Sequence, residues 1–308
     1  MTDGIELLAG FLAAAVRVAT PLLLAATGET LAERSGVINL GIEGSMLAGA
    51  LAAAIGSSAA GPWSGLGAAL IAGAALAAVF ALVSVHARAD QIIAGTAITL
   101  GAVGLTGAVY RAYYGAAGAG LSIPMLAPVE VPLLAEIPLL GAALFAQPVT
   151  TYFAVSLVPV TWWFLFRTRA GLALRAAGES AGGARAAGVR VRAARTLAVV
   201  AGGALAGLAG ATLVLAQVGT FSERMTAGRG FIAIAIVVLG RWHPGGVLVA
   251  ALVFGAATAL QLVFQASGTA VPYQLFLMLP YVLALLGLAG AVGRVRAPRD
   301  LGRPEGAS

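Results

Sequence analysis

The sequence contains no cysteine and no lysine, and only two of its 308 residues are histidines. Without cysteine there is no disulfide, no thiol nucleophile and no thiolate metal ligand. His86 and His243 lie far apart in sequence and lack the spacing of a metal-ligand pair. A phosphate-binding Walker A motif requires a lysine, so this chain cannot contain one. These absences argue against an intramembrane enzyme, a metal centre and a nucleotide site on this chain.

Charged residues are also scarce, at 10% of the chain, whereas 60% of the residues are hydrophobic. Soluble domains carry about 25% charged residues. The composition therefore predicts an integral membrane protein, and its long apolar runs favour helices over the short alternating strands of a barrel. We expect an all-α, polytopic protein with about 8–10 spans, forming a single domain over residues 1–308. The apolar runs fall at about 5–27, 45–60, 64–86, 91–110, 148–166, 196–216, 228–240, 247–265 and 272–291.

The charge that is present is unevenly distributed. Residues 167–195 contain seven arginines and one glutamate, a charge of +6 that equals the net charge of the whole chain. Because basic loops resist translocation, this loop is expected in the cytoplasm, together with Arg88, Arg241 and the tail 294–308. Residues 115–147 carry only acidic charges and four prolines, so they are expected outside, as is the N-terminus. The basic pI reports this topology and contact with membrane lipids, and we expect no nucleic-acid partner.

Two apolar runs, 45–60 and 228–240, are too short to cross a bilayer alone, since a span needs about 20 residues. Each follows a polar stretch that contains glycine, at 29–44 and 217–230. Interrupted backbone at membrane depth is tolerated where it is buried in protein or lines a cavity, and paired interruptions point to a transport pathway. The side chains expected in a translocation path or gate are Glu29, Glu33, Arg34, Asn39, Glu43, Glu223 and Arg229.

The same charged residues have a simpler interpretation. Ionisable groups within the hydrocarbon cost a few kcal/mol and usually pair with each other, so Glu33 and Arg34 can form a structural ion pair at the cytoplasmic interface. The tripeptides Ala32–Glu33–Arg34 and Ser222–Glu223–Arg224 also repeat in the two halves, which suggests an internal duplication.

Small residues recur at three- and four-residue steps in the basic loop, at Ala173, Ala177, Ala181, Ala184 and Gly188. A short helix with such a face can approach another surface closely. The alternative is a solvated loop with an amphipathic helix at the interface, which the shortage of large apolar residues disfavours.

The motif Gly171–Leu–Ala–Leu–Arg–Ala–Ala–Gly–Glu179, with Ala186–Ala–Gly188, resembles the cytoplasmic loop of ABC-importer permeases. In that loop a coupling helix docks on the ATPase subunit. The fourteen residues Leu31–Ala–Glu–Arg–Ser–Gly–Val–Ile–Asn–Leu–Gly–Ile–Glu–Gly44 are similar to the branched-chain amino acid/simple-sugar permease family, and look closest to its nucleoside (guanosine-type) members. Gly228–Ala235 and Gly240–Gly245 add a third match. The resemblance assigns ATPase coupling to Gly171, Arg175, Gly178, Glu179, Arg185 and Gly188.

This resemblance implies the permease subunit of an ATP-driven ABC importer in a bacterial plasma membrane. Its implied partners are a cytoplasmic ABC ATPase that uses ATP, a second permease subunit in a heterodimer, and an extracytoplasmic substrate-binding lipoprotein. No cofactor is expected on this chain. Nucleosides are the first substrate class, simple sugars the second and branched-chain amino acids the third. The alternative function is an ion-coupled secondary transporter that uses Glu43 or Glu29 for proton coupling.

Overall fold

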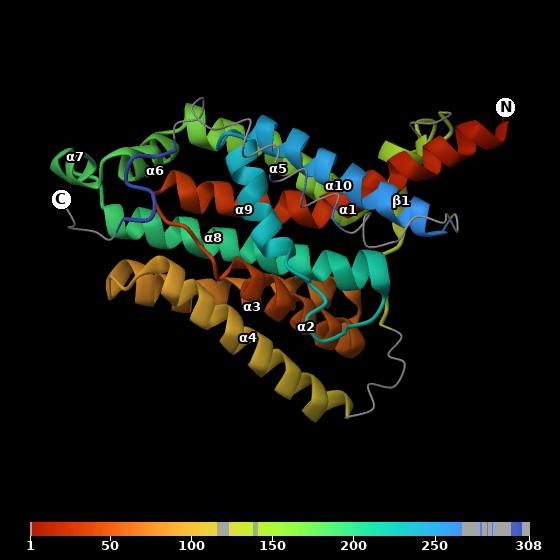
Figure 1. Cartoon of the computed structure of the whole chain (residues 1–308), viewed down its shortest axis with the longest axis horizontal. Coiled ribbons are helices and arrows are strands. Elements are labelled where there is room, and N and C mark those ends of the chain that lie inside the picture. Colours follow the sequence, from red (N-terminus) through yellow and green to blue (C-terminus); the bar gives the residue numbers. More distant parts are fainter. Residues whose placement is uncertain are drawn as a thin grey trace.

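The structure, a computed structural model, describes residues 2–115, 123–137, 141–266 and 297–303, together with Met278, Val282 and Leu285. These parts are almost entirely helical (Figure 1). The long helices are α1 (Thr2–Arg34), α2 (Ile42–Ala60), α3 (Pro62–Ala81), α4 (Gln91–Tyr114), α5 (Val149–Arg167), α8 (Val191–Thr212) and α10 (Pro244–Ala266). The shorter elements are α6 (Arg169–Glu179), α7 (Ala181–Ala186), α9 (Arg229–Leu239) and the π-helical turns η1 (Leu82–His86), η2 (Gly141–Phe145) and η3 (Leu213–Val218). A small antiparallel pair joins β1 (Pro128–Glu130) to β2 (Ala146–Pro148).

Seven helices among the described residues are long and apolar enough to cross a membrane, and α9 is a shorter apolar helix. The expected polytopic, all-α fold is therefore confirmed. The predicted run at 272–291 lies almost wholly outside the described residues.

The first interruption is shorter than the sequence suggested. Helix α1 continues without a break through Glu29 to Arg34, and only residues 35–41 separate it from α2. The expectation that residues 45–60 are too short to span is wrong, because α2 begins at Ile42 and has 19 residues. The second interruption agrees better with the prediction, since the chain leaves the helix after Val218 and α9 has only 11 residues.

Helix α8 forms the centre of the bundle and packs against α1, α2 and α3 (Figure 1). Its glycines allow this close approach. A Cβ on Gly207 would lie 2.1 Å from the Ala69 carbonyl oxygen of α3, and one on Gly202 would lie 2.8 Å from the Gly28 oxygen of α1. Packing of small residues is the usual way for helices to associate in lipid, where no hydrophobic force acts between them.

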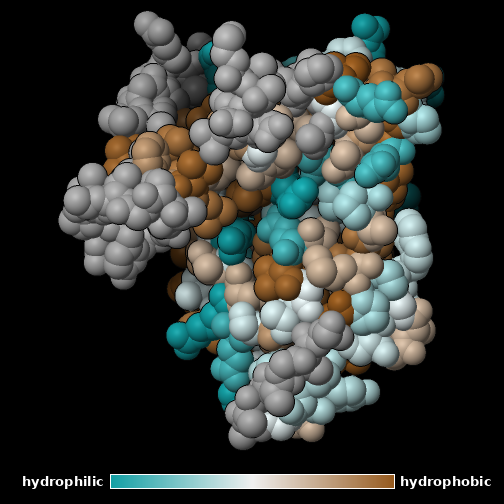
Figure 2. Space-filling model, turned by 90° about the vertical axis from the view of Figure 1, so that its right-hand side faces the viewer, coloured by the Kyte–Doolittle hydropathy of each residue, from teal (hydrophilic) through white to brown (hydrophobic). Residues whose placement is uncertain are grey.

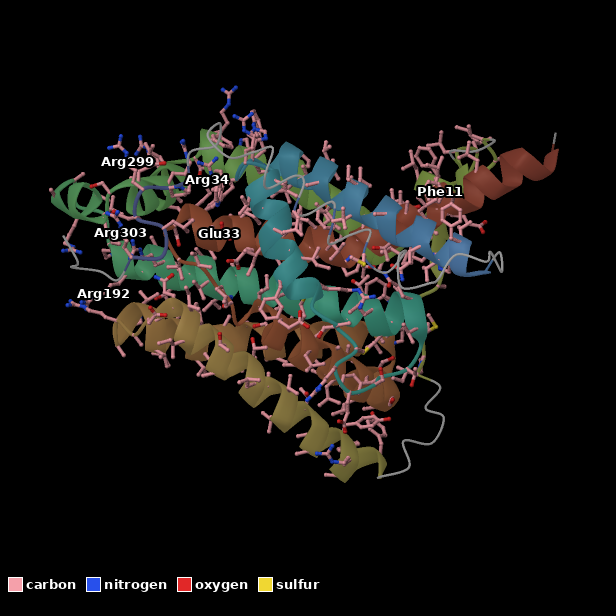
Figure 3. All side chains as sticks on the ribbon, in the orientation of Figure 1. Phe11, Glu33, Arg34, Arg192, Arg299 and Arg303 are labelled. Atoms are coloured by element: carbon pink, nitrogen blue, oxygen red, sulfur yellow. The ribbon has the colours of Figure 1, made fainter. Side chains whose placement is uncertain are left out.

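The segments that the sequence predicts to be basic and cytoplasmic lie at one end of the bundle. Helices α6 and α7 share this end with the described part of the C-terminal tail, and Arg192, Arg299 and Arg303 point away from the bundle there (Figure 3). The N-terminus of α1 and strand β1 lie at the opposite end (Figure 1). Viewed toward that opposite end, the surface mixes hydrophilic and hydrophobic residues (Figure 2). The charge distribution therefore follows the long axis of the molecule.

Candidate translocation and coupling sites

The two interrupted segments meet at Glu43, in the first turn of α2, whose side chain is buried. One of its carboxylate oxygens, Oε1, accepts hydrogen bonds from Thr226 Oγ1 at 2.6 Å and from the backbone N–H of Gly228 at 2.9 Å. The other, Oε2, accepts from the N–H of Gly230 at 2.6 Å. Glu43 therefore caps the N-terminus of α9, where free N–H groups and the helix dipole favour a carboxylate.

The turn before α9 is held by further contacts of the same segment. Arg229 donates from Nη1 to the carbonyl oxygens of Met225 and Thr226, at 3.0 and 3.2 Å. Gly230 has no room for a side chain, because a Cβ there would lie 2.7 Å from Cα of Glu43. The start of α9 is thus seated directly on the start of α2, and any movement of α9 has to break or carry these contacts.

Glu29 and Asn39 form a second buried polar cluster at the end of α1. Oε1 of Glu29 accepts from the backbone N–H of Asn39 at 2.9 Å, and both residues are 1% exposed. The Oε2 atom of Glu29 and both amide atoms of Asn39 are buried without a hydrogen-bond partner among the residues that the structure describes. Leaving such atoms unsatisfied costs about 1–3 kcal/mol for each group. A rearrangement of the loop that supplies hydrogen-bond partners would therefore lower the free energy.

Glu33 and Arg34 do not form the ion pair that the simpler interpretation predicted. Both bind the turn between α9 and α10: Trp242 Nε1 donates to Oε2 of Glu33, and Arg34 Nε donates to the carbonyl oxygen of Trp242 at 2.9 Å. Trp242 is buried and has a φ of 53°, in the left-handed region that non-glycine residues rarely adopt. The end of α1 is therefore fastened to the end of α9.

Glu223 lies elsewhere. It forms an exposed ion pair with Arg111 of α4, a residue that the sequence did not single out. Glu33 is buried and bound to Trp242, so the matching tripeptides at Glu33 and Glu223 have different environments in the two halves. The structure brings Glu43 and Arg229 to the start of α9, Glu29 and Asn39 to the loop before α2, and Glu33 and Arg34 to Trp242. Glu223 pairs with Arg111 of α4 instead.

The basic loop folds as α6 and α7, and its small-residue face turns inward. Ala177, Ala181 and Ala184 are buried together with Val191. Gly178 is buried against α1, where a Cβ would lie 2.3 Å from the Arg34 carbonyl oxygen, and Gly171 is buried against α5. Three of the five residues of this face are therefore packed against the chain's own helices, whereas Ala173 is half-buried and Gly188 is exposed.

The outward surface of these helices contains different residues. Leu172, Glu179 and Arg185 are exposed, as are Gly182 and Gly188. Arg175 is half-buried: its Nε donates to the Leu165 carbonyl oxygen at 2.9 Å, and its guanidinium lies 4.9 Å from the centre of the Phe166 ring. Of the predicted coupling residues, Glu179, Arg185 and Gly188 are thus accessible, whereas Gly171 and Gly178 position the helices from within.

The sequence Gly178–Glu–Ser–Ala–Gly182 has the spacing of a hydrolase nucleophile elbow, GxSxG, but the local structure is different. That motif requires a strand followed by a helix. Here Ser180 joins two helices, and its hydroxyl caps α7 by accepting from the N–H of Gly183 at 3.1 Å. Ser180 therefore has a structural role.

Arg195 and the tail residues 297–303 form a junction that the sequence did not reveal. Arg195 of α8 is buried and donates to the carbonyl oxygens of Ser35, Ala177 and Arg303. The tail supplies further bonds, from Asp300 N–H to the Gly178 oxygen at 2.9 Å and from Gly302 N–H to the Gly36 oxygen at 3.1 Å. Asp300 also accepts from the N–H of Ala181 at 2.7 Å. Together these residues connect α6 and α7 to the loop 35–41.

Residues 11–288 match the protein family described as the branched-chain amino acid transport system / permease component. The chain belongs to this family. Three relatives agree with that membership. A protein of Haloferax volcanii, provisionally named as the glucose ABC transporter permease TsgC13, is 43% identical over 82% of this chain and 77% of its own length. The guanosine ABC transporter permease NupQ of Bacillus subtilis is 35% identical over 98% of both chains. The nucleoside ABC transporter permease NupC of Lactococcus lactis subsp. cremoris is 33% identical over 91% of both. No solved structure matches the chain.

Family membership confirms that this is a permease subunit of an ATP-driven ABC importer and a transporter component, not an enzyme. It also sets aside the ion-coupled secondary transporter. Permeases of this family work with an ATPase that uses ATP and with a substrate-binding protein. With seven apolar helices long enough to cross a bilayer, the chain is an integral membrane protein.

Proposed function

We propose that this permease imports nucleosides. The support comes from the guanosine and nucleoside permeases, which resemble the chain over 98% and 91% of its length. Simple sugars are the second candidate, because the glucose-permease relative from Haloferax volcanii has the higher identity, 43%, over a shorter part of the chain. We propose a cytoplasmic ABC ATPase, a second permease chain in a heterodimer and an extracytoplasmic lipoprotein as partners, with ATP hydrolysed on the ATPase alone.

The proposed orientation places α6, α7 and the tail 294–308 in the cytoplasm of a bacterial plasma membrane. The positive-inside rule supports it, because the basic segments share one end of the bundle. The N-terminus and β1 then face outward, toward the binding protein. All described segments belong to one permease domain, residues 1–308, in which the basic loop 167–195 is the cytoplasmic surface for the ATPase.

The mechanism rests on one observation, a continuous path of contacts from the basic loop to the start of α9. Helices α6 and α7 bind the loop 35–41 through Gly178, Arg195 and the tail. The end of α1 binds Trp242 through Glu33 and Arg34. Trp242 follows α9, whose other end is held by Glu43.

We propose that ATPase movement displaces α6 and α7 and that this path transmits the displacement to both interrupted segments. The contacts of Glu43 with residues 226–230 then act as a gate between outward and inward access. Glu29 and Asn39 supply polar groups that the described arrangement leaves unsatisfied. This assigns gate roles to Glu29, Glu33, Arg34, Asn39, Glu43 and Arg229, whereas Glu223 with Arg111 would hold the end of α4 to the loop before α9.

The coupling step can be tested in the whole transporter, reconstituted with its ATPase, second permease and binding protein. Reversing the exposed charges with Glu179→Arg and Arg185→Glu is expected to reduce substrate-stimulated ATP hydrolysis by about tenfold. Glu130→Arg, an exposed charge reversal on β1 at the opposite end, is the control for association and should retain the ATPase. If the paired variant retains both ATPase association and stimulation, the coupling surface is not on α6 and α7.

The substrate is tested separately in vesicles that contain the same assembly. ATP-dependent uptake of labelled guanosine, competed by other nucleosides and not by glucose, is the expected result. Uptake of glucose without uptake of guanosine would assign the sugar class instead.

A further inference from the structure

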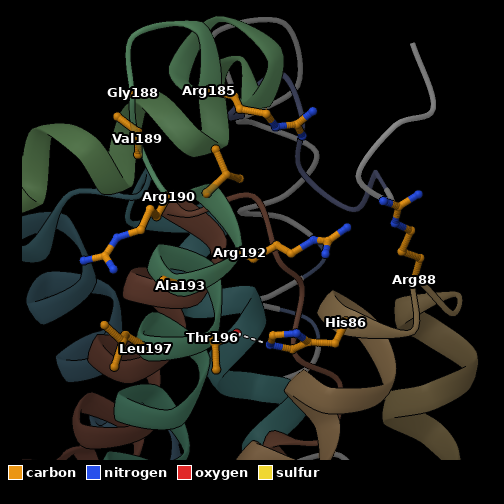
Figure 4. Close-up of a pocket in the computed structure, with 11 residues that line it drawn as sticks. His86, Arg88, Arg185, Gly188, Val189, Arg190, Arg192, Ala193, Thr196 and Leu197 are labelled. Atoms are coloured by element: carbon orange, nitrogen blue, oxygen red, sulfur yellow. Dashed lines mark hydrogen bonds between the residues drawn. The ribbon is translucent and has the colours of Figure 1, made fainter.

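A basic cavity of about 960 Å³ lies at the α6–α7 end of the molecule, between η1 and the N-terminus of α8 (Figure 4). Four arginines line it, together with His86, and the remaining lining residues are small or apolar. The arginines are Arg88, Arg185, Arg190 and Arg192. All four are exposed, and none of the described lining residues is acidic. The described lining therefore carries charge of one sign.

The walls of this cavity are held by backbone turns and by a side-chain hydrogen bond. His86 Nε2 and Thr196 Oγ1 lie 3.1 Å apart in a hydrogen bond that joins η1 to α8 (Figure 4). Gly188 has a φ of 84° and ends α7, so the chain turns sharply into Arg190. Arg88 has a φ of 60°, a left-handed conformation that costs a non-glycine residue about 1 kcal/mol or more and is concentrated at functional sites.

The cavity also has an apolar side. Leu197, which lines it, is 70% exposed, and Leu82, one helical turn before His86, is 60% exposed. Both belong to helices that are long and apolar enough to cross a membrane. Cationic groups beside an exposed apolar helix surface, at the end of the spans, lie at the depth where lipid headgroups meet acyl chains.

We propose that this cavity binds an anionic glycerophospholipid of the inner leaflet. The phosphate would lie between Arg88 and Arg192, whose side chains extend toward each other (Figure 4), because guanidinium groups suit bidentate contact with phosphate oxygens. One acyl chain would follow Leu82 along the bundle. Basic pockets between helices on the cytoplasmic side are a favoured place for anionic headgroups.

Binding is tested with the full-length chain in detergent, by native mass spectrometry against phosphatidylglycerol, phosphatidylcholine and inorganic phosphate. The test variant is Arg88→Gln/Arg192→Gln. The control, Arg167→Gln/Arg299→Gln, removes the same charge from exposed positions at the same end that do not line the cavity. Thermal unfolding of both variants shows that each is folded.

We expect the chain to prefer phosphatidylglycerol to phosphatidylcholine. Its affinity for phosphatidylglycerol should fall by at least about tenfold in the test variant, since each basic residue near an anionic surface adds measurably to binding, and should change little in the control. Equal binding of the two lipids, or an equal loss in the control, would overturn the proposal. Binding of inorganic phosphate that equals that of the lipid would show a simple anion site instead. If the test variant keeps its lipid and loses the ATPase in the assembled transporter, the arginines belong to the ATPase interface.

Discussion

At the scale of single residues, Glu43 is the buried side chain whose chemical identity is most closely constrained by its hydrogen bonds. Three donors converge on its two oxygens, and they come from a segment more than 180 residues away. Since each of these three partners is a donor, the carboxylate is the group that satisfies them all. Its burial within α2 is tolerated because each charge-assisted hydrogen bond is stronger than a neutral one.

Glu43→Gln tests this interpretation with nearly the same side-chain volume. An amide has only one oxygen, so its NH2 group would face a backbone or hydroxyl donor and leave at least one buried group unpaired. We expect the free energy of unfolding to fall by about 1–3 kcal/mol. Denaturant unfolding of the purified chain measures the change, and transport by the assembled complex should fall with it. Glu136→Gln, at an exposed position, should leave stability unaltered, and an identical loss in both variants would refute the capping role.

Gly207 provides a second test at this scale. A Cβ at this position would lie 2.1 Å from the Ala69 carbonyl oxygen and 3.1 Å from Cα of Gly73, and both of these are backbone atoms that cannot simply rotate away. Gly207→Ala is therefore expected to destabilise the chain by about 1–3 kcal/mol through overpacking. Gly101→Ala, in α4 with nothing within 4 Å of its Cβ, is the matched control and should unfold at or above the parent temperature.

At the scale of elements, the sequence predicted where helices occur better than where they end. Apolar runs coincide with all seven spans found among the described residues, because lipid demands continuous helices of a set length, although the run at 45–60 was expected to be too short to cross. The start of α2 was missed by three residues, since Ile42, Glu43 and Gly44 look like a polar linker until Glu43 is seen to bind α9. Likewise, the helical spacing of Ala177, Ala181 and Ala184 identified a face without revealing that it packs inward.

The junction between α6, α7 and the tail was the part of the site least accessible to prediction. Arg195 was counted as one more charge in a basic loop, although it lies on the buried face of α8, and Ala198 and Val199 follow it within one turn. The carbonyl oxygens of Ser35, Ala177 and Arg303, which accept from it, belong to the backbone and leave no trace in the residue types. Contacts of this kind between distant backbone segments require the folded structure.

Asp300→Ala tests this junction. The carboxylate of Asp300 accepts from Ala181 N–H at the first residue of α7, and losing such a cap costs about 1 kcal/mol. We expect faster amide hydrogen exchange in α7, with exchange in the α3–α8 contact unchanged. Faster exchange throughout the bundle would show a general loss of stability, and unaltered exchange in α7 would show that the tail does not hold it.

At the scale of the whole molecule, charge and length together predict an orientation that the absence of cysteine makes easy to test. Single cysteines at Glu130 and Arg299 lie at opposite ends of the bundle, both exposed. In intact cells an impermeant maleimide is expected to modify the Glu130→Cys chain, and to modify Arg299→Cys only after lysis. The cysteine-free parent gives the background, and the reverse pattern would invert the proposed topology.

The bond between Glu43 and the start of α9 also has a consequence for how the protein is made. Synthesis proceeds from the N-terminus, so α2 is complete while residues 226–230 are still to be translated. During that interval the Glu43 carboxylate lacks all three of its final donors, and a bare carboxylate in hydrocarbon costs a few kcal/mol. We therefore expect the start of α2 to stay close to water or to the insertion machinery until residues 226–230 are made and bind Glu43.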